Sequence, residues 1–422
     1  MQRRAKPPVW NRLRPAHWLG KLTLSATLGV TLLGFATAPS LAQKKYDTGV
    51  TDSEIKIGNI MPYSGPASAY GIIGKTMSAY FRMINDTGGI NGRKINFISY
   101  DDAYSPPKTV EQARKLVESD EVFLIFASLG TAPNAAIQKY MNNMKVPQIF
   151  VATGASRWGD PEHFPWTIGW QPNYRAEGRV YATYILQHHP EAKLGVLYQN
   201  DDFGKDYVLG LRDVLREKYD QMVVASVPYE IAMPTVDSQV VAIKSANPDI
   251  FINIATPKFA AQAIKKVAEL GWHPVHIMTN VSASVGAVLK PAGLENSKGI
   301  LTAQYQMDVT DPQWDSTPGM KRFRAFMEKY YPEADRAESG PLTAWNTSTA
   351  LTEVLKRCGD NLTRENVMKV VANMDFEIGN YLPGIRVKTT PTDFFPIEQV
   401  QMSRFNGTNW ELFGPIIDGH AE

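Results

Sequence analysis

Two pairs of adjacent carboxylates are the first residues of this chain that could carry out chemistry. Asp101-Asp102 and Asp201-Asp202 each follow a short apolar run that is typical of a buried strand. Paired carboxylates can act as general acid and base, but Asp at the start of a helix also accepts hydrogen bonds from free N–H groups. No GxSxG nucleophile motif accompanies either pair. We therefore interpret both pairs as helix caps, and the sequence does not predict an enzyme.

The stretch 71–76 (GIIGKT) ends like the loop that wraps nucleotide phosphates. That loop needs a glycine five residues before the glycine of its GK[ST] ending. Ala69 stands at that position. We interpret the stretch as the start of a helix with Lys75 exposed, and we expect no nucleotide cofactor.

The histidines do not form a metal-binding set, because no HExxH motif or comparable ligand spacing occurs among them. The single cysteine, Cys358, has no partner for an internal disulfide. Its place at the end of an amphipathic stretch is typical of an inert, half-buried thiol. We expect no metal and no cofactor.

The N-terminal segment predicts export. Residues 1–21 are basic and contain no acid, 22–38 is an uncharged apolar run, and Ser40-Leu41-Ala42 is a small-residue site. These are the three parts of a secretory signal peptide, which we place at 1–42. The segment holds six of the 44 Lys and Arg residues, so the remainder has 38 basic and 42 acidic residues, a net charge of −4. We therefore expect a periplasmic protein with no nucleic-acid partner.

From residue 54 onward, short apolar runs alternate with longer stretches of helical period. A strand at 54–61, a helix at 71–87 and a strand at 94–100 begin the pattern. The alternation restarts after an aromatic- and proline-rich stretch at 158–170, and 396–413 predicts a terminal hairpin. Two α/β runs of this kind predict two lobes, each with a largely parallel sheet covered by helices.

The loops that follow the expected strands have an unusual composition. Those at 62–71, 127–134 and 152–156 hold small and hydroxylated residues without a strong acid or base. Ligands of open α/β sheets bind beyond the carboxyl ends of the strands. Hydroxyls and free N–H groups at helix starts suit a carboxylate.

These loops are part of a set of motifs that resembles the periplasmic branched-chain amino acid binding proteins of ABC importers, the leucine/isoleucine/valine-binding family. The order and spacing of the motifs carry the resemblance, which covers the whole chain after the signal peptide. The motifs are IKIGNIMPYSGPASAYG (55–71), NDTGGINGRKI (85–95), YDDAYSPPKTVEQARKLV (100–117), IFASLGTAPNAA (125–136), YQNDDFGKDY (198–207), NPDIFIN (247–253) and GW (271–272).

The resemblance implies a type I periplasmic binding protein: two Rossmann-like lobes with parallel-type sheets, joined by a three-segment hinge. One lobe comprises 50–168 plus 305–380, and the other 169–304 plus 381–422. It also implies a solute receptor that works with an inner-membrane ABC permease, and we expect a monomer.

The resemblance assigns ligand contacts to positions that match the family's motifs. The aromatic residue that covers the ligand matches Tyr70. The hydroxyl that grips the ligand carboxylate matches Thr131, with Ser128 nearby. The second-lobe aromatic residue matches Phe203, which keeps the ring and loses the phenol.

The second carboxylate-binding hydroxyl falls in the loop 153–156. Thr153 and Ser156 both remain open as the residue concerned, and Ala155 offers its backbone. Aromatic residues near these loops are candidates either for a stacking wall or for packing between the lobes. They are Tyr63, Trp158, Trp166, Trp170 and Phe203.

Two positions depart from the family pattern. A further tyrosine of the family aligns with Ala255, and the glutamate that pairs with the ligand ammonium aligns near Val281, within 279–282. Asn280 and Ser282 are polar neighbours without charge. A buried ammonium that has lost its carboxylate costs about 3–5 kcal/mol. An aromatic or aliphatic carboxylate therefore competes with an amino acid as the expected ligand.

A periplasmic ligand sensor or regulator on the same fold is the alternative function. A secreted hydrolase, for which no nucleophile–base pair is present, is the third.

Overall fold

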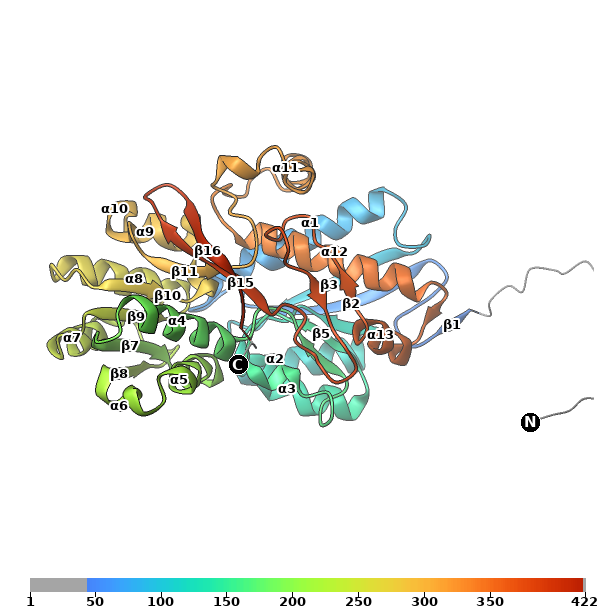
Figure 1. Ribbon diagram of the computed structural model, residues 1–422. Coiled ribbons are helices and arrows are strands. Elements are labelled where there is room, and N and C mark those ends of the chain that lie inside the picture. Colours follow the sequence, from blue (N-terminus) through green and yellow to red (C-terminus); the bar gives the residue numbers. More distant parts are fainter. Residues whose placement is uncertain (1–43, 420–422) are drawn as a thin grey trace, which may run out of the picture. The chain divides into compact units, whose positions relative to one another are not determined.

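The computed structural model describes residues 44–419 (Figure 1). The signal peptide expected at 1–42 lies outside the described residues. Within 44–419, no helix is both long and apolar enough to cross a membrane. In the same range, no three side chains of His, Cys, Asp or Glu gather as metal ligands would.

The first sheet has five parallel strands in the order β3-β2-β4-β5-β6. Helices α1 and α3 and the α2 segment connect successive strands, so the carboxyl ends of the strands face one edge of the sheet. The strands are β2 (Glu54–Met61), β3 (Lys94–Asp101), β4 (Leu124–Phe126), β5 (Gln148–Val151) and β6 (Thr167–Gly169). The helices are α1 (Gly71–Asp86), α2 (Pro106–Arg114), continued by a π-helical turn at Lys115–Ser119, and α3 (Thr131–Met144).

The second sheet has seven strands in the order β16-β15-β11-β10-β9-β7-β8. Five of them are parallel, and an antiparallel hairpin, predicted from the sequence, completes one edge. The parallel strands are β7 (Leu194–Gln199), β8 (Val223–Tyr229), β9 (Ile250–Ile254), β10 (Val275–Met278) and β11 (Leu301–Gln304). The hairpin strands are β15 (Gln399–Phe405) and β16 (Trp410–Asp418).

The helices of the second sheet include one very close pair, α4 (Tyr174–His188) and α5 (Asp202–Leu215). A Cβ added at Gly210 of α5 would lie 2.2 Å from the carbonyl oxygen of Arg175 of α4, so only glycine permits this approach. The other helices are α6 (Tyr219–Met222), α7 (Asp237–Ser245), α8 (Pro257–Glu269), α9 (Lys290–Ala292) and α10 (Leu294–Ser297).

After β11 the chain returns toward the elements of the first sheet. Helix α12 (Gly340–Cys358) packs against α1, where the Tyr80 hydroxyl lies 3.2 Å from Oγ1 of Thr352. The neighbouring elements are α11 (Pro318–Tyr330), α13 (Arg364–Val371) and two small sheets. In these sheets β1 (Lys45–Tyr46) pairs with β12 (Asn361–Leu362), and β13 (Asp375–Phe376) pairs with β14 (Val387–Lys388). The lobe boundaries given above stay a prediction.

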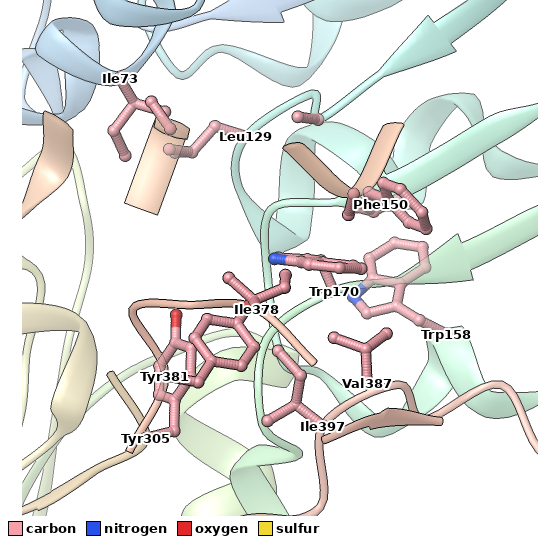
Figure 2. Close-up of a cluster of buried hydrophobic side chains, with 14 of the residues drawn as sticks. Ile73, Leu129, Phe150, Trp158, Trp170, Tyr305, Ile378, Tyr381, Val387 and Ile397 are labelled. Carbon is pink, nitrogen blue, oxygen red and sulfur yellow. The ribbon is translucent and has the colours of Figure 1, made fainter. Parts of the chain in front are cut away.

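The core near these returning segments combines aromatic rings with aliphatic side chains (Figure 2). The rings of Phe150 and Trp170 lie 4.3 Å apart, and those of Tyr305 and Tyr381 lie 5.4 Å apart. Trp158 and Trp170 are each only 1% exposed. Of the two roles considered for these tryptophans, the structure supports core packing.

The paired carboxylates take different roles. Asp201 caps α5, as predicted, by accepting hydrogen bonds from the N–H groups of Phe203 (3.1 Å) and Gly204 (3.4 Å). The prediction for the other pair was wrong, because α2 begins after Ser105. Asp101 instead accepts the N–H of Tyr63 (2.8 Å), which ties two loops together.

Candidate ligand-binding site

A buried pocket lies where the carboxyl ends of strands from both sheets meet. Loops after β2, β3, β4 and β5 supply one part of its wall. Segments after β6, β7, β9 and β10 supply the rest. The pocket encloses about 370 Å³ of empty space, part of it open to solvent. This is the position where open α/β sheets bind ligands.

Two threonine hydroxyls meet on the pocket wall. Oγ1 of Thr131 and Oγ1 of Thr153 are 2.6 Å apart and share a hydrogen bond, and both side chains are buried. Thr131 begins α3, and the φ of +103° at Gly130 turns the chain into that helix. The first N–H groups of a helix have no partner within it. The two hydroxyls therefore stand beside donors that suit an anion.

Four aromatic side chains line the same pocket: Tyr70, Tyr104, Tyr174 and Phe203. The rings of Tyr174 and Phe203 lie 5.0 Å apart in an edge-on arrangement. Burial raises the pKa of Tyr70 and of Tyr104 well above the ordinary value of 10, so both phenols stay protonated. The wall thus combines apolar ring faces with neutral hydroxyl donors.

One hydrogen bond joins the loops of the two sheets across the pocket. The Tyr70 hydroxyl, just before α1, donates to the main-chain carbonyl of Val281, after β10, at 3.1 Å. A second cavity with about 770 Å³ of empty space, part of it open to solvent, shares Tyr70 and Val281 with the first. The Tyr70–Val281 contact therefore stands between the two cavities.

No charged side chain lines the first pocket within the part of the chain that the structure describes. Val281, near the position expected for the family's glutamate, lies on its wall. Ala255 is fully buried, and its carbonyl accepts a hydrogen bond from the Ser282 hydroxyl at 2.5 Å. The pocket consequently offers oxygen acceptors to an ammonium group but no countercharge.

Five of the ten site residues predicted from the sequence line this pocket, and five do not. Those on the wall are Tyr70, Thr131, Thr153, Phe203 and Val281. Those elsewhere are Ser128, Ala155, Ser156, Ala255 and Asn280.

Three of the residues off the wall have other roles or surroundings. The N–H of Ser156 donates to Asp206 at 2.6 Å, and its hydroxyl accepts from Asn173 at 3.0 Å. Asn280 lines the second cavity and donates its side-chain amide to the carbonyl of Ala303 at 2.5 Å. Ser128 is buried, and its hydroxyl has no hydrogen-bond partner among the residues that the structure describes. Of the two hydroxyls left open by the sequence, Thr153 is the one on the pocket wall.

Sequence reasoning missed several wall residues. Tyr104 and Thr256 follow the ends of β3 and β9 within three residues, so the strand-end rule alone could have found them. Tyr174 is the first residue of α4 and its hydroxyl donates to Gln171 at 3.1 Å. No sequence signal distinguished it from the aromatic residues that pack in the core.

A family model described as periplasmic binding protein matches residues 54–409. The chain belongs to the periplasmic binding protein family. A similar relative is the Leu/Ile/Val-binding protein homolog 7 of Brucella abortus, 23% identical over 391 residues, which cover 89% of this chain and 93% of the relative. The family recognised from the sequence motifs is thereby confirmed, and its members are described as periplasmic binding proteins.

Solved structures confirm the type I periplasmic binding protein fold. A branched-chain amino acid ABC transporter protein from Thermus thermophilus, solved with bound valine, has a TM-score of 0.76 at 18% identity. The match covers 87% of this chain and 97% of that one. An ABC transporter solute-binding protein from R. palustris, in complex with 4-hydroxybenzoate, has a TM-score of 0.73 at 17% identity with the same two coverages.

Proposed function

We propose that this chain is the periplasmic solute-binding protein of an ABC importer and that it binds a small carboxylate without an ammonium group, such as an aromatic or aliphatic acid. The observation that carries the proposal is the hydroxyl pair of Thr131 and Thr153 in a buried pocket that no charged side chain of residues 44–419 lines. An inner-membrane ABC permease is the proposed partner, and the proposed working form is a monomer.

The balance of costs favours an acid over an amino acid. A carboxylate gains charge-assisted hydrogen bonds from the hydroxyls and from the start of α3. An ammonium group would be buried beside Val281 without a carboxylate to pair with, which costs several kcal/mol. The aromatic rings of the wall can pack against an apolar body instead.

The two structural neighbours show that the fold alone does not determine which solute binds, so the ligand has to be inferred from the pocket residues. One of these proteins holds valine and the other 4-hydroxybenzoate, at almost equal similarity to this chain. The fold therefore accommodates both kinds of solute. In this chain the wall includes Val281 and, among the described residues, no charged side chain, which supports the acid rather than the amino acid.

Thermal unfolding of the purified chain without its first 42 residues tests the proposal. Benzoate, 4-hydroxybenzoate and hexanoate are compared with leucine and valine, and benzamide serves as the uncharged control. A ligand at a hundred times its Kd stabilises the folded state by about 2.7 kcal/mol. We expect an acid, but neither amino acid nor benzamide, to raise the Tm without being chemically changed. Strong stabilisation by leucine or valine with no effect of the acids would contradict the proposal.

A further inference from the structure

A buried carboxylate lies directly behind the pocket wall. Glu177 of α4 is 2% exposed. Its Oε1 accepts hydrogen bonds from the main-chain N–H of Asn280 at 2.8 Å and from the Tyr181 hydroxyl at 2.5 Å. No Lys, Arg or His of the described chain forms an ion pair with it. A buried carboxylate without a cation is costly, so its presence needs a functional explanation.

The segment that Glu177 contacts forms part of the pocket. Three neighbouring residues are held by groups from other parts of the chain: Thr279 by the Tyr207 hydroxyl at 2.6 Å, Val281 by the Tyr70 hydroxyl, and Ser282 by the main-chain carbonyl of Ala255. Asn280 is the residue just before Val281. Its main-chain N–H donates a hydrogen bond to Glu177. The bond to Glu177 therefore restrains the backbone that leads into Val281, whose own peptide group is held by the Ser282 N–H on the carbonyl of Thr279 at 3.2 Å.

We propose that Glu177 is a positioning residue of the binding site, whose carboxylate fixes the backbone at Asn280 and so aims the Val281 carbonyl at the Tyr70 hydroxyl. Glu177 itself does not line either cavity, so it acts through the wall rather than on the solute. The inference extends the proposed function, because the contact it supports joins the two loops that would enclose a solute.

Glu177 is also the group in this cluster that titrates near neutral pH. Burial raises its pKa from 4.5 to about 7. The titratable groups that face it are phenols: Tyr174 and Tyr181 on its own helix, Tyr207 on α5 and Tyr305 after β11. Burial raises the pKa of each phenol above 10, so they remain neutral. The ionised carboxylate is the stronger acceptor, so the Asn280 bond weakens as pH falls through about 7.

Amide hydrogen exchange tests this role without any solute. Protection of the amides in 279–282, corrected for intrinsic rates, is measured at pH 6 and pH 8 in the wild-type protein and in Glu177→Gln. We expect wild-type protection to be about threefold or more lower at pH 6, and protection in the variant to be equal at both values. Amides of β7 serve as the internal control. A fall of the same size in Glu177→Gln, or no fall in the wild type, overturns the proposal.

The affinity for benzoate, by titration calorimetry at the same two pH values, gives the second readout. We expect about three- to tenfold weaker binding at pH 6 in the wild type, with no pH dependence in Glu177→Gln. Glu177→Asp keeps the charge and is expected to restore part of the pH dependence. Tighter wild-type binding at pH 6 would mean that the carboxylate repels the acid, and it overturns the positioning role. If benzoate does not bind at either pH, the proposed ligand class fails for this acid, and hydrogen exchange alone decides the role of Glu177.

Discussion

The buried carboxyl of Glu177 makes the protein less stable as pH rises. Below pH 4.5 this group is neutral in both the folded and the unfolded chain. Between 4.5 and about 7 the unfolded chain ionises while the folded protein keeps its proton. Because an acid with a raised pKa stabilises the folded state only in its neutral form, the contribution is present at low pH and lost through this window.

The size of the effect follows from the same values. Each pH unit within the window lowers the free energy of unfolding by about 1.4 kcal/mol. The total loss is therefore about 3 kcal/mol by pH 8. The Gln of Glu177→Gln cannot ionise, and its carbonyl can still accept from Asn280 and Tyr181. We expect the stability of the variant relative to wild type to rise by about 3 kcal/mol between pH 4.5 and pH 8.

Urea unfolding followed by tryptophan fluorescence measures this difference. Both proteins are unfolded at pH 4.5 and at pH 8, and at each pH the free energy of unfolding of the wild type is subtracted from that of the variant. The cost of the substitution itself cancels when the two results are compared. If the variant and the wild type differ in free energy of unfolding by the same amount at both pH values, the reasoning from the raised pKa of Glu177 is refuted. A variant that is more stable at pH 8 but has lost its pH-dependent binding would show that this buried charge serves the site at the expense of the fold.

Two further predictions concern the hydroxyl pair and its support. Thr131→Val and Thr153→Val are each expected to weaken benzoate binding by about 1–3 kcal/mol in titration calorimetry, the cost of an unmade buried hydrogen bond, whereas Ser156→Ala, off the pocket wall, is expected to leave it unchanged. Unaltered affinity in Thr131→Val would remove that residue from the site. Gly130→Ala is expected to lower the free energy of unfolding by more than Gly88→Ala in urea unfolding. Both glycines have a positive φ (+103° and +106°), but only a Cβ at Gly130 meets a neighbour, a tyrosine ring at 2.5 Å. Equal losses of unfolding free energy in the two glycine variants would mean that the tyrosine ring moves aside at no cost.

Long elements were predictable from the sequence because their apolar period is repeated many times. The strand expected at 54–61 is β2, and the helix expected at 71–87 is α1, one residue shorter. β6 was missed, since a three-residue strand shows no period and lies in a stretch rich in proline and aromatic residues. Its place at the edge of the sheet depends on pairing with β5, which is a long-range contact.

The candidate site was predictable in position but only partly in its residues. Strand ends located the loops that hold Thr131 and Thr153. Which hydroxyl of a loop faces inward depends on backbone turns that composition does not show, and Ser156 instead bonds Asn173. The sequence left Trp170 open between lining the site and packing, and the structure places its ring 4.3 Å from that of Phe150, on the neighbouring strand β5, in the core (Figure 2). Glu177 looked like an ordinary helix residue, and only its burial distinguishes it.

The hydrogen bond between Thr131 and Thr153 sets a rule for what can displace it. Each hydroxyl has a single proton, and one of these protons already lies between the two oxygens. The other proton is not used by this bond, so one hydroxyl of the pair can donate to a solute oxygen while the bond stays. A second donation to the solute requires the shared proton to leave the pair. An ionised carboxylate is a stronger acceptor than an alcohol or a ketone, so it compensates better for that exchange. The threonine pair thus favours an anionic acceptor over a neutral one.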